Sequence, residues 1–153
     1  MAHVLLDHPA VRAAALGRVV VTAWHSAPEV DVIAALEAAV EPHHLRFPDG
    51  GALVVVPSKE QPTPEARKAL QAFLERQGDR LAGATALLAV TGIKGSLLRT
   101  AAKGVIAAMR LPFPIKLSAS AAEAATQVIE LLRARGLSAP SARELERFIE
   151  HPA

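Results

Sequence analysis

The chain has 153 residues, of which 51% are hydrophobic, 21% are charged and 3% are aromatic. A domain of this length buries roughly 70% of the surface that its unfolded chain exposes, so the composition excludes intrinsic disorder. The absence of cysteine excludes disulfides, thiolate metal sites and a cysteine nucleophile. The net charge of +2 is too small for an obligate polyanion binder, so we expect no nucleic-acid partner.

The N-terminal sequence lacks the basic leader and long apolar core of a signal peptide. The longest nearly apolar stretch, from Leu81 to Ile93, is too short to span a bilayer. We therefore expect a cytoplasmic protein with no integral membrane segment. A single domain is predicted over residues 1–153, with a core over about 11–135 and a C-terminal helix over about 142–150.

The first predicted element is Val11–Leu16, for which two structures stay open. Gly17 and Arg18 suit a type II′ turn, which would pair this segment with the apolar run that follows. The rival is a short alanine-rich helix that begins at Pro9. We predict the hairpin.

Short apolar runs with β-branched residues predict the remaining strands. Successive positions in these runs are apolar, which is typical of strands that are covered on both faces. In chain order the predicted strands are Arg18–Trp24, Ala52–Val56, Ala84–Thr91 and the weaker Ile115–Ser118.

Helix starts are marked by capping signals. Three Ser-x-x-Glu sequences match the capping box, in which the serine oxygen accepts from the third helical N–H: these begin at Ser26, Ser120 and Ser141. Thr63 before Pro64 marks a fourth start, and Gly78 and Gly136 mark two ends. The predicted helices cover 27–41, 64–77, 96–110, 121–135 and 142–150, and each has one apolar stripe. In the third helix that stripe contains Leu98, Ala102, Val105 and Met109.

Strands and helices alternate along the chain, and crossovers of this length favour parallel pairing. The predicted fold is α/β, with a mixed, largely parallel sheet of four to five strands and amphipathic helices packed on it. Trp24 is expected to anchor the core or its rim.

Catalytic and metal-binding motifs are missing from the sequence. It contains no G-x-S-x-G, no G-x-G-x-x-G and no Walker spacing. His43 and His44 are adjacent, so their side chains diverge, and we interpret them as an exposed loop pair rather than metal ligands. We predict no catalytic residue, no metal and no cofactor.

A basic stripe is the more specific feature. At about 100° per residue, Arg99, Lys103 and Arg110 fall within about 40° of one another on the third predicted helix. Lys94 and Lys116 would extend a surface for anionic lipid headgroups, nucleotides or an acidic partner. The plainer alternative is an ordinary solvated helix face.

Two loops offer further candidates. Gly92–Ser96 follows a strand and opens a helix, so its amides and Lys94 would suit an anion; the favoured interpretation is a simple turn with Ser96 as N-cap. Ser58 and Thr63 are candidate phosphoacceptors near a helix start, although capping alone accounts for Thr63.

The order of these elements, with the Leu111–Ile115 segment leading into the last strand, resembles the STAS domain and, more narrowly, SpoIIAA-like and STAS/SEC14-type bacterial proteins. The resemblance covers about Val11 to Arg135. Anti-sigma-factor antagonists of that family carry an Asp and an Asp-Ser-Ser-Gly-like phosphoacceptor string. The corresponding segment, Pro57–Pro64, has neither and offers only the hydroxyls of Ser58 and Thr63.

The resemblance implies a non-enzymatic regulatory or binding module that acts through a protein partner or a lipid-like or anionic ligand in the bacterial cytosol. The alternative is an enzyme or nucleotide-binding protein that uses residues 92–96 as an anion site. A third hypothesis is weak peripheral membrane association through Arg99, Lys103 and Arg110.

Overall fold

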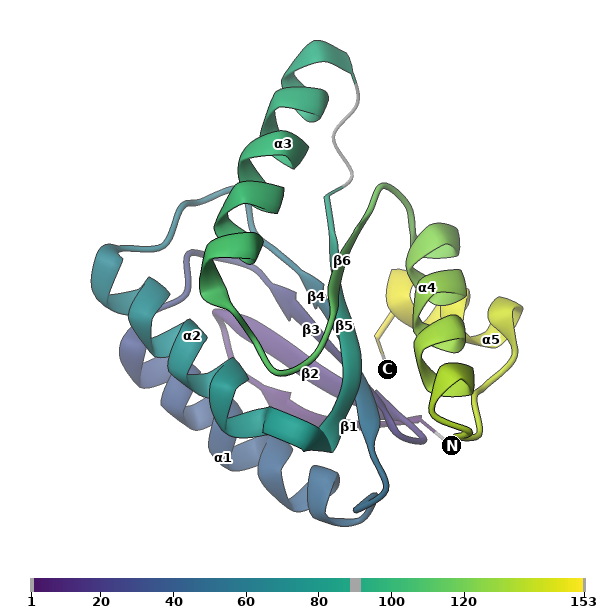
Figure 1. Cartoon of the computed structure of the whole chain (residues 1–153). Coiled ribbons are helices and arrows are strands. Elements are labelled where there is room, and N and C mark those ends of the chain that lie inside the picture. Colours follow the sequence, from purple (N-terminus) through teal and green to yellow (C-terminus); the bar gives the residue numbers. More distant parts are fainter. Residues whose placement is uncertain (1, 89–91, 153) are drawn as a thin grey trace.

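A computed structural model of the chain describes residues 2–88 and 92–152 (Figure 1). Six strands form one sheet in chain order: β1 (Ala2–Asp7), β2 (Val11–Leu16), β3 (Val19–Trp24), β4 (Gly51–Val56), β5 (Leu81–Leu87) and β6 (Ile115–Ser118). The helices are α1 (Val30–Leu45), α2 (Pro64–Gln77), α3 (Gly92–Met109), α4 (Ala121–Ala134) and α5 (Ala142–Glu150).

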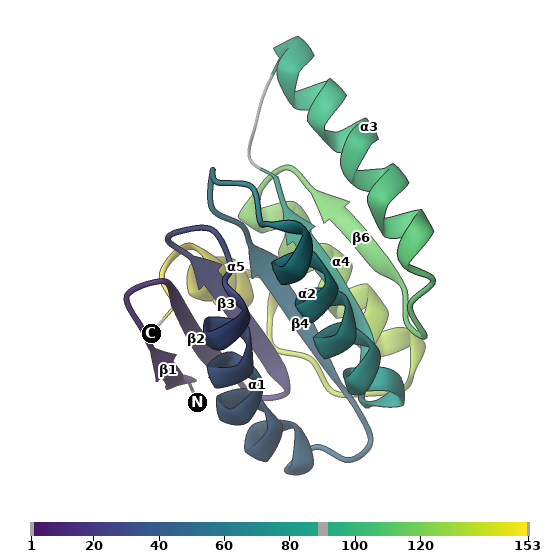
Figure 2. The same cartoon turned by 90° about the vertical axis from the view of Figure 1, so that its left-hand side faces the viewer.

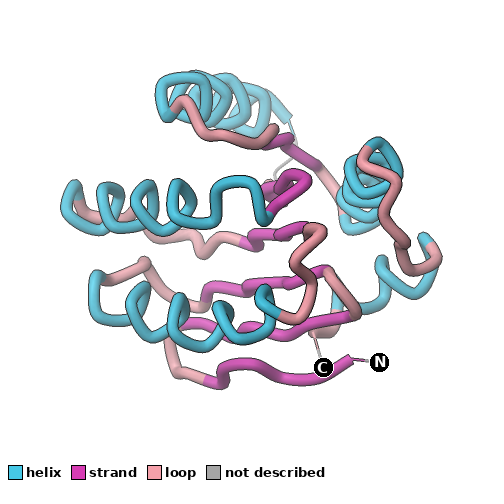
Figure 3. Tube along the Cα trace, turned by 60° about the horizontal axis from the view of Figure 1, so that its bottom comes forward, coloured by secondary structure: helices cyan, strands magenta, loops and turns pink. Residues whose placement is uncertain are grey.

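The sheet is mixed. Strands β1, β2 and β3 pair antiparallel, and β3 to β6 pair parallel. Helices α1, α2 and α3 lie on one side of the sheet and α4 and α5 on the other, as Figures 2 and 3 show. The predicted mixed α/β class is confirmed, and the strand beyond the predicted four to five is β1.

The hairpin between β2 and β3 confirms one of the two structures left open for Val11–Leu16, and the short helix is wrong. Leu16 pairs with Val19, so Gly17 and Arg18 form a two-residue turn. Gly17 has φ +57°, whereas Arg18 is not among the residues with positive φ. This combination is the one that a type II′ turn requires.

Two apolar layers cover the sheet. On the first face, side chains such as Val20 and Leu53 pack against α1 and α2. On the second, Val19, Val21 and Val54 pack against α4 and α5. The central strands are buried on both faces, as their unbroken apolar runs predicted.

Three of the five predicted N-caps form. The hydroxyls of Thr63, Ser120 and Ser141 accept from the backbone N–H groups three residues on, at 3.1 to 3.2 Å. Gly136, with φ +71°, ends α4 in a Schellman motif, in which Leu137 N–H donates to Leu132 and Gly136 N–H to Arg133.

The first helix departs from its prediction at both ends. Its N-cap is Glu29 and no side chain caps it, so the capping box predicted at Ser26 is wrong. Instead, the Glu60 carboxylate accepts from Ala27 N–H at 2.8 Å, which holds this segment against the β4–α2 loop. The helix also runs through Pro42 to Leu45, four residues beyond the predicted end at 41.

The β5–α3 region differs from its prediction as well. Strand β5 begins at Leu81 rather than Ala84, and the predicted strand end, Thr91, lies outside the described residues. Helix α3 begins at Gly92. Ser96 therefore lies inside the helix, and its interpretation as N-cap is wrong.

Strand β4 is brought close to the β2–β3 turn. A Cβ atom on Gly51 would lie 2.5 Å from the Arg18 carbonyl oxygen, so only glycine fits there. The Arg18 guanidinium donates to Asp49 at 2.9 Å and to the Gly50 carbonyl at 2.7 Å. These contacts fix the start of the parallel half of the sheet.

The caps give a first test. We expect Ser120→Ala to lower the free energy of unfolding by about 1 kcal/mol, because it removes a formed N-cap bond. Ser26→Ala, at a serine of the same sequence pattern that caps no helix, should change it by less than about 0.5 kcal/mol. Urea unfolding measures both, and equal losses would contradict the assigned start of α1.

Candidate functional site

Helix α3 projects from the rest of the fold. Its N-terminal half extends past the ends of the strands, and its C-terminal half descends toward β6 (Figures 1 and 2). Four of the predicted surface residues, Lys94, Ser96, Arg99 and Lys103, lie on it, and Arg110 follows its last residue.

The outer side of α3 is apolar. Leu97 is 66% exposed, Leu98 45% and Val105 50%, and at 100° per residue they fall within about 100° of one another. Exposed alanines, Ala101 and Ala108, lie between them. The predicted burial of Leu98 and Val105 is wrong, because this side of the helix faces away from the sheet.

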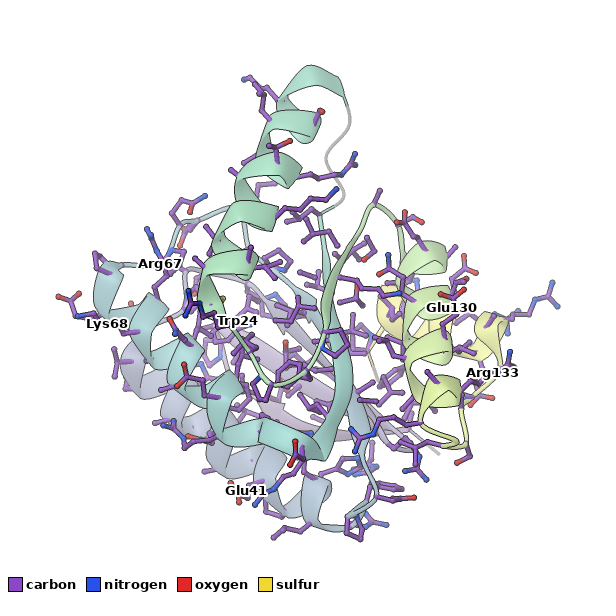
Figure 4. All side chains as sticks on the ribbon, viewed as in Figure 1. Trp24, Glu41, Arg67, Lys68, Glu130 and Arg133 are labelled. Atoms are coloured by element: carbon purple, nitrogen blue, oxygen red, sulfur yellow. The ribbon has the colours of Figure 1, made fainter. Side chains whose placement is uncertain are left out.

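The inner side of α3 carries the half-buried residues. Ala102, Ile106 and Met109 are half-buried, and so is Arg99. The other helices have the usual arrangement, in which charged side chains such as Arg67, Lys68 and Glu130 lie at the outer surface (Figure 4). In α3, by contrast, exposed apolar side chains share the outer surface with exposed cations.

The exposed cations of α3 fall into two groups. Lys103 lies on the helix side opposite the apolar outer face, together with the half-buried Arg99. Arg110 is exposed and follows the helix with φ +49°, so the helical angle does not place it on either side. Lys94 lies on the outer side, near the projecting end. No acidic residue occurs between Gly92 and Arg110, so the whole segment is basic.

Lys116 lies elsewhere. It is exposed on β6 and pairs in register with Thr85, whose hydroxyl contacts Gln127 of α4 at 2.6 Å. Lys116 therefore belongs to the sheet face covered by α4, across the sheet from α3.

The predicted phosphoacceptors have defined contacts. Thr63 caps α2, since its hydroxyl accepts from Ala66 N–H at 3.2 Å. The Ser58 hydroxyl accepts from Glu60 N–H at 3.2 Å and donates to the Glu60 carbonyl. Both residues lie in the β4–α2 loop that also holds Ala27.

The adjacent histidines are not an exposed loop pair, and that prediction is wrong. Because α1 continues past Pro42, His43 and His44 lie in its last turn, each only 4% exposed. His43 donates from Nε2 to the Gly17 carbonyl at 2.8 Å, and His44 donates from Nδ1 to Gln77 Oε1 at 2.6 Å. The second ring nitrogen of each is buried without a partner.

Burial lowers the pKa of both histidines below 6.5, against the opposing effect of their hydrogen bonds to Gly17 and Gln77. The neutral rings therefore act as packing groups that connect α1 to the β2–β3 turn and to α2. Among residues 2–88 and 92–152, no group of three or more metal-binding side chains occurs.

Two shallow depressions lie on the described surface. One is lined by α1 residues and Arg76, and the other lies between α5 and the start of the chain. Both carboxylates of the first are ion-paired, Glu37 with Arg76 at 2.6 Å and Glu41 with Arg80 at 2.9 Å. Arg80 lowers the pKa of Glu41, which opposes a role as a general base.

No protein-family model, curated protein or solved structure matched the chain. No helix in the described part of the chain has the length and apolar character needed to cross a bilayer. The anion site predicted over residues 92–96 stays a prediction, because it adjoins residues 89–91, which lie outside the described ranges.

The buried histidines predict a pH dependence of stability. Their pKa values are lower in the folded than in the unfolded state, so the unfolded chain binds more protons below pH 6.5. Stability should therefore be complete above pH 6.5 and fall as the pH drops from there toward the lowered pKa values.

Urea unfolding between pH 5 and 8 measures this dependence. His43→Gln retains a donor for the Gly17 carbonyl but cannot titrate, so its dependence should be weaker. His25→Gln, at an exposed position, is the control and should behave as the wild type. Equal pH dependence in all three proteins would contradict the prediction.

Proposed function

We propose that the chain is a non-enzymatic binding module that docks on anionic lipid surfaces through α3. The observation that carries the proposal is the apolar outer face of a projecting helix, with Leu97, Leu98 and Val105 between 45% and 66% exposed. Exposed apolar patches on a folded domain mark interaction sites.

Charge favours a lipid surface as the partner. A helix that lies in a membrane interface has an apolar face opposite a polar face rich in Lys and Arg. The segment from Gly92 to Arg110 fits this description, since it carries four cations and no acidic residue. Each cation near an anionic leaflet contributes about 1 kcal/mol to binding.

The exposed apolar residues of α3 determine how deeply the helix can insert into a membrane interface. Each leucine side chain gains about 1.5 to 3 kcal/mol when it is moved fully from water into an apolar medium. Because Leu97 and Leu98 lie near the projecting end, this end would enter the interface while the sheet stays outside. Lys94, on the same side, would reach the headgroups with its ammonium group.

A non-enzymatic role is supported by the contacts of the carboxylates and histidines, the side chains most often used in acid–base catalysis. The carboxylates in the α1 depression are ion-paired, and the buried histidines serve as packing groups. We include in this proposal the kinship with STAS and SEC14-type proteins that the order of elements led us to expect. It would place the module among regulatory or lipid-binding proteins.

Sedimentation with vesicles tests the proposal. We expect binding to vesicles that contain phosphatidylserine, and weaker binding to purely zwitterionic vesicles or at high salt, because salt screens the charges of α3. Leu97→Glu/Val105→Glu should lower the partition coefficient at least about tenfold. Val30→Glu, at an apolar α1 position that is 51% exposed, is the matched control and should leave binding unchanged.

Two results would refute the proposed function. One is absence of sedimentation with phosphatidylserine vesicles at low salt. The other is an equal loss of binding in the α3 double variant and in the Val30→Glu control. Circular dichroism of each variant confirms that the fold is kept.

A further inference from the structure

His43 has a ring nitrogen that the fold leaves without a partner. The side chain is 4% exposed, and its Nε2 donates to the Gly17 carbonyl oxygen at 2.8 Å. A neutral imidazole carries one proton, so Nδ1 is the nitrogen with a free lone pair. Nδ1 is buried and accepts no hydrogen bond. Buried polar atoms are nearly always paired, so this lone pair calls for an explanation.

A second histidine lies beside this ring, although it is distant in the chain. His3 of β1 pairs in register with Ala15 of β2, whose side chain belongs to the core layer that α1 covers. Directly opposed residues of an antiparallel pair share one face of the sheet, so His3 is on the α1 side. Its ring centroid lies 5.3 Å from that of His43, with the two rings at 61°. His3 is exposed, so water reaches this pair.

The separation of the two rings fits a shared metal ion. Zinc–nitrogen bonds are about 2.0 to 2.1 Å long, which places the ion about 3.2 Å from each ring centroid. With a tetrahedral angle between the two bonds, the centroids lie about 5.2 Å apart. The observed separation of 5.3 Å is close to this value. The exposed His3 ring can adjust its orientation, whereas Gly17 holds the buried His43 ring.

The contacts of His43 are those of a metal ligand. A ligating histidine almost always donates its other ring N–H to a carbonyl or carboxylate oxygen, which fixes the tautomer. The bond from Nε2 to Gly17 has this role. The ring of Phe47 lies 5.2 Å from that of His43 and gives the ligand an apolar neighbour.

Two cations lie near His43, and neither is an uncompensated buried charge. The Arg18 guanidinium, over the Phe47 ring, is paired with Asp49 at 2.9 Å. Arg46 is exposed, so solvent and salt screen its charge.

We propose that His3 and His43 bind one divalent transition metal ion, so that the ion joins β1 to the last turn of α1. Imidazole ligands suit zinc, copper and nickel. Water completes the coordination on the exposed side of His3. His44 takes no part, because adjacent side chains diverge, and the second ligand comes from β1. The site is separate from α3 and does not depend on the proposed lipid binding.

Calorimetric titration with Zn²⁺ tests the site. We expect the wild type to bind one ion per chain. His43→Gln should raise the dissociation constant at least about tenfold, because glutamine keeps a donor for Gly17 but has no imidazole lone pair. His25→Gln, at an exposed position, is the control and should bind as the wild type. Absence of binding by the wild type, or equal affinities of the two variants, would overturn the proposal.

Nuclear magnetic resonance of the wild type keeps the test decisive if His43→Gln fails to fold. Long-range proton–nitrogen correlations distinguish the two nitrogens of each ring. Zinc should shift Nδ1 of His43 together with one nitrogen of His3, and leave the His25 ring unchanged. A shift of His3 without any shift of His43 would assign the ion to an exposed histidine alone and would overturn the proposal.

Discussion

Strands β3 and β4 have no side that faces water, and the rest of the fold depends on this constraint. Parallel strands buried on both faces require a helical layer above and below the sheet. Helices α1 and α2 supply one layer and α4 and α5 the other. The apolar outer face of α3 belongs to neither layer and stays exposed, and it is the surface on which the proposed lipid docking rests.

Most of the fold could be predicted from local sequence signals. The runs at Val19–Trp24 and Gly51–Val56 are apolar at successive positions, which distinguishes covered strands from half-exposed ones. Ser120 and Ser141 cap their helices because the bonds involved join residues only three positions apart. Such signals depend only on residues that are close together in the chain, so they can be recognised from the sequence alone.

The errors arise where distant residues decide the outcome. Ser26 has a complete capping pattern, but Glu60 binds the following backbone instead. His43 and His44 are buried because α1 continues past Pro42, and Gly17 and Gln77, which are distant in the chain, accept their ring protons. The exposure of the apolar outer face of α3 is likewise set by the whole fold. Periodicity identifies an apolar face, but it does not say whether that face contacts the sheet.

The strands lie in the sheet in the same order as they occur along the chain, and this order affects how the sheet can form during synthesis. Every strand pairs with the one made just before it, so the sheet can grow as the polypeptide leaves the ribosome. The layer formed by α4 and α5 is made last, however, from residue 121 onward. Until then Val19, Val21 and Val54 would be exposed in a nascent sheet, which makes this stage the one at which a chaperone would be most useful.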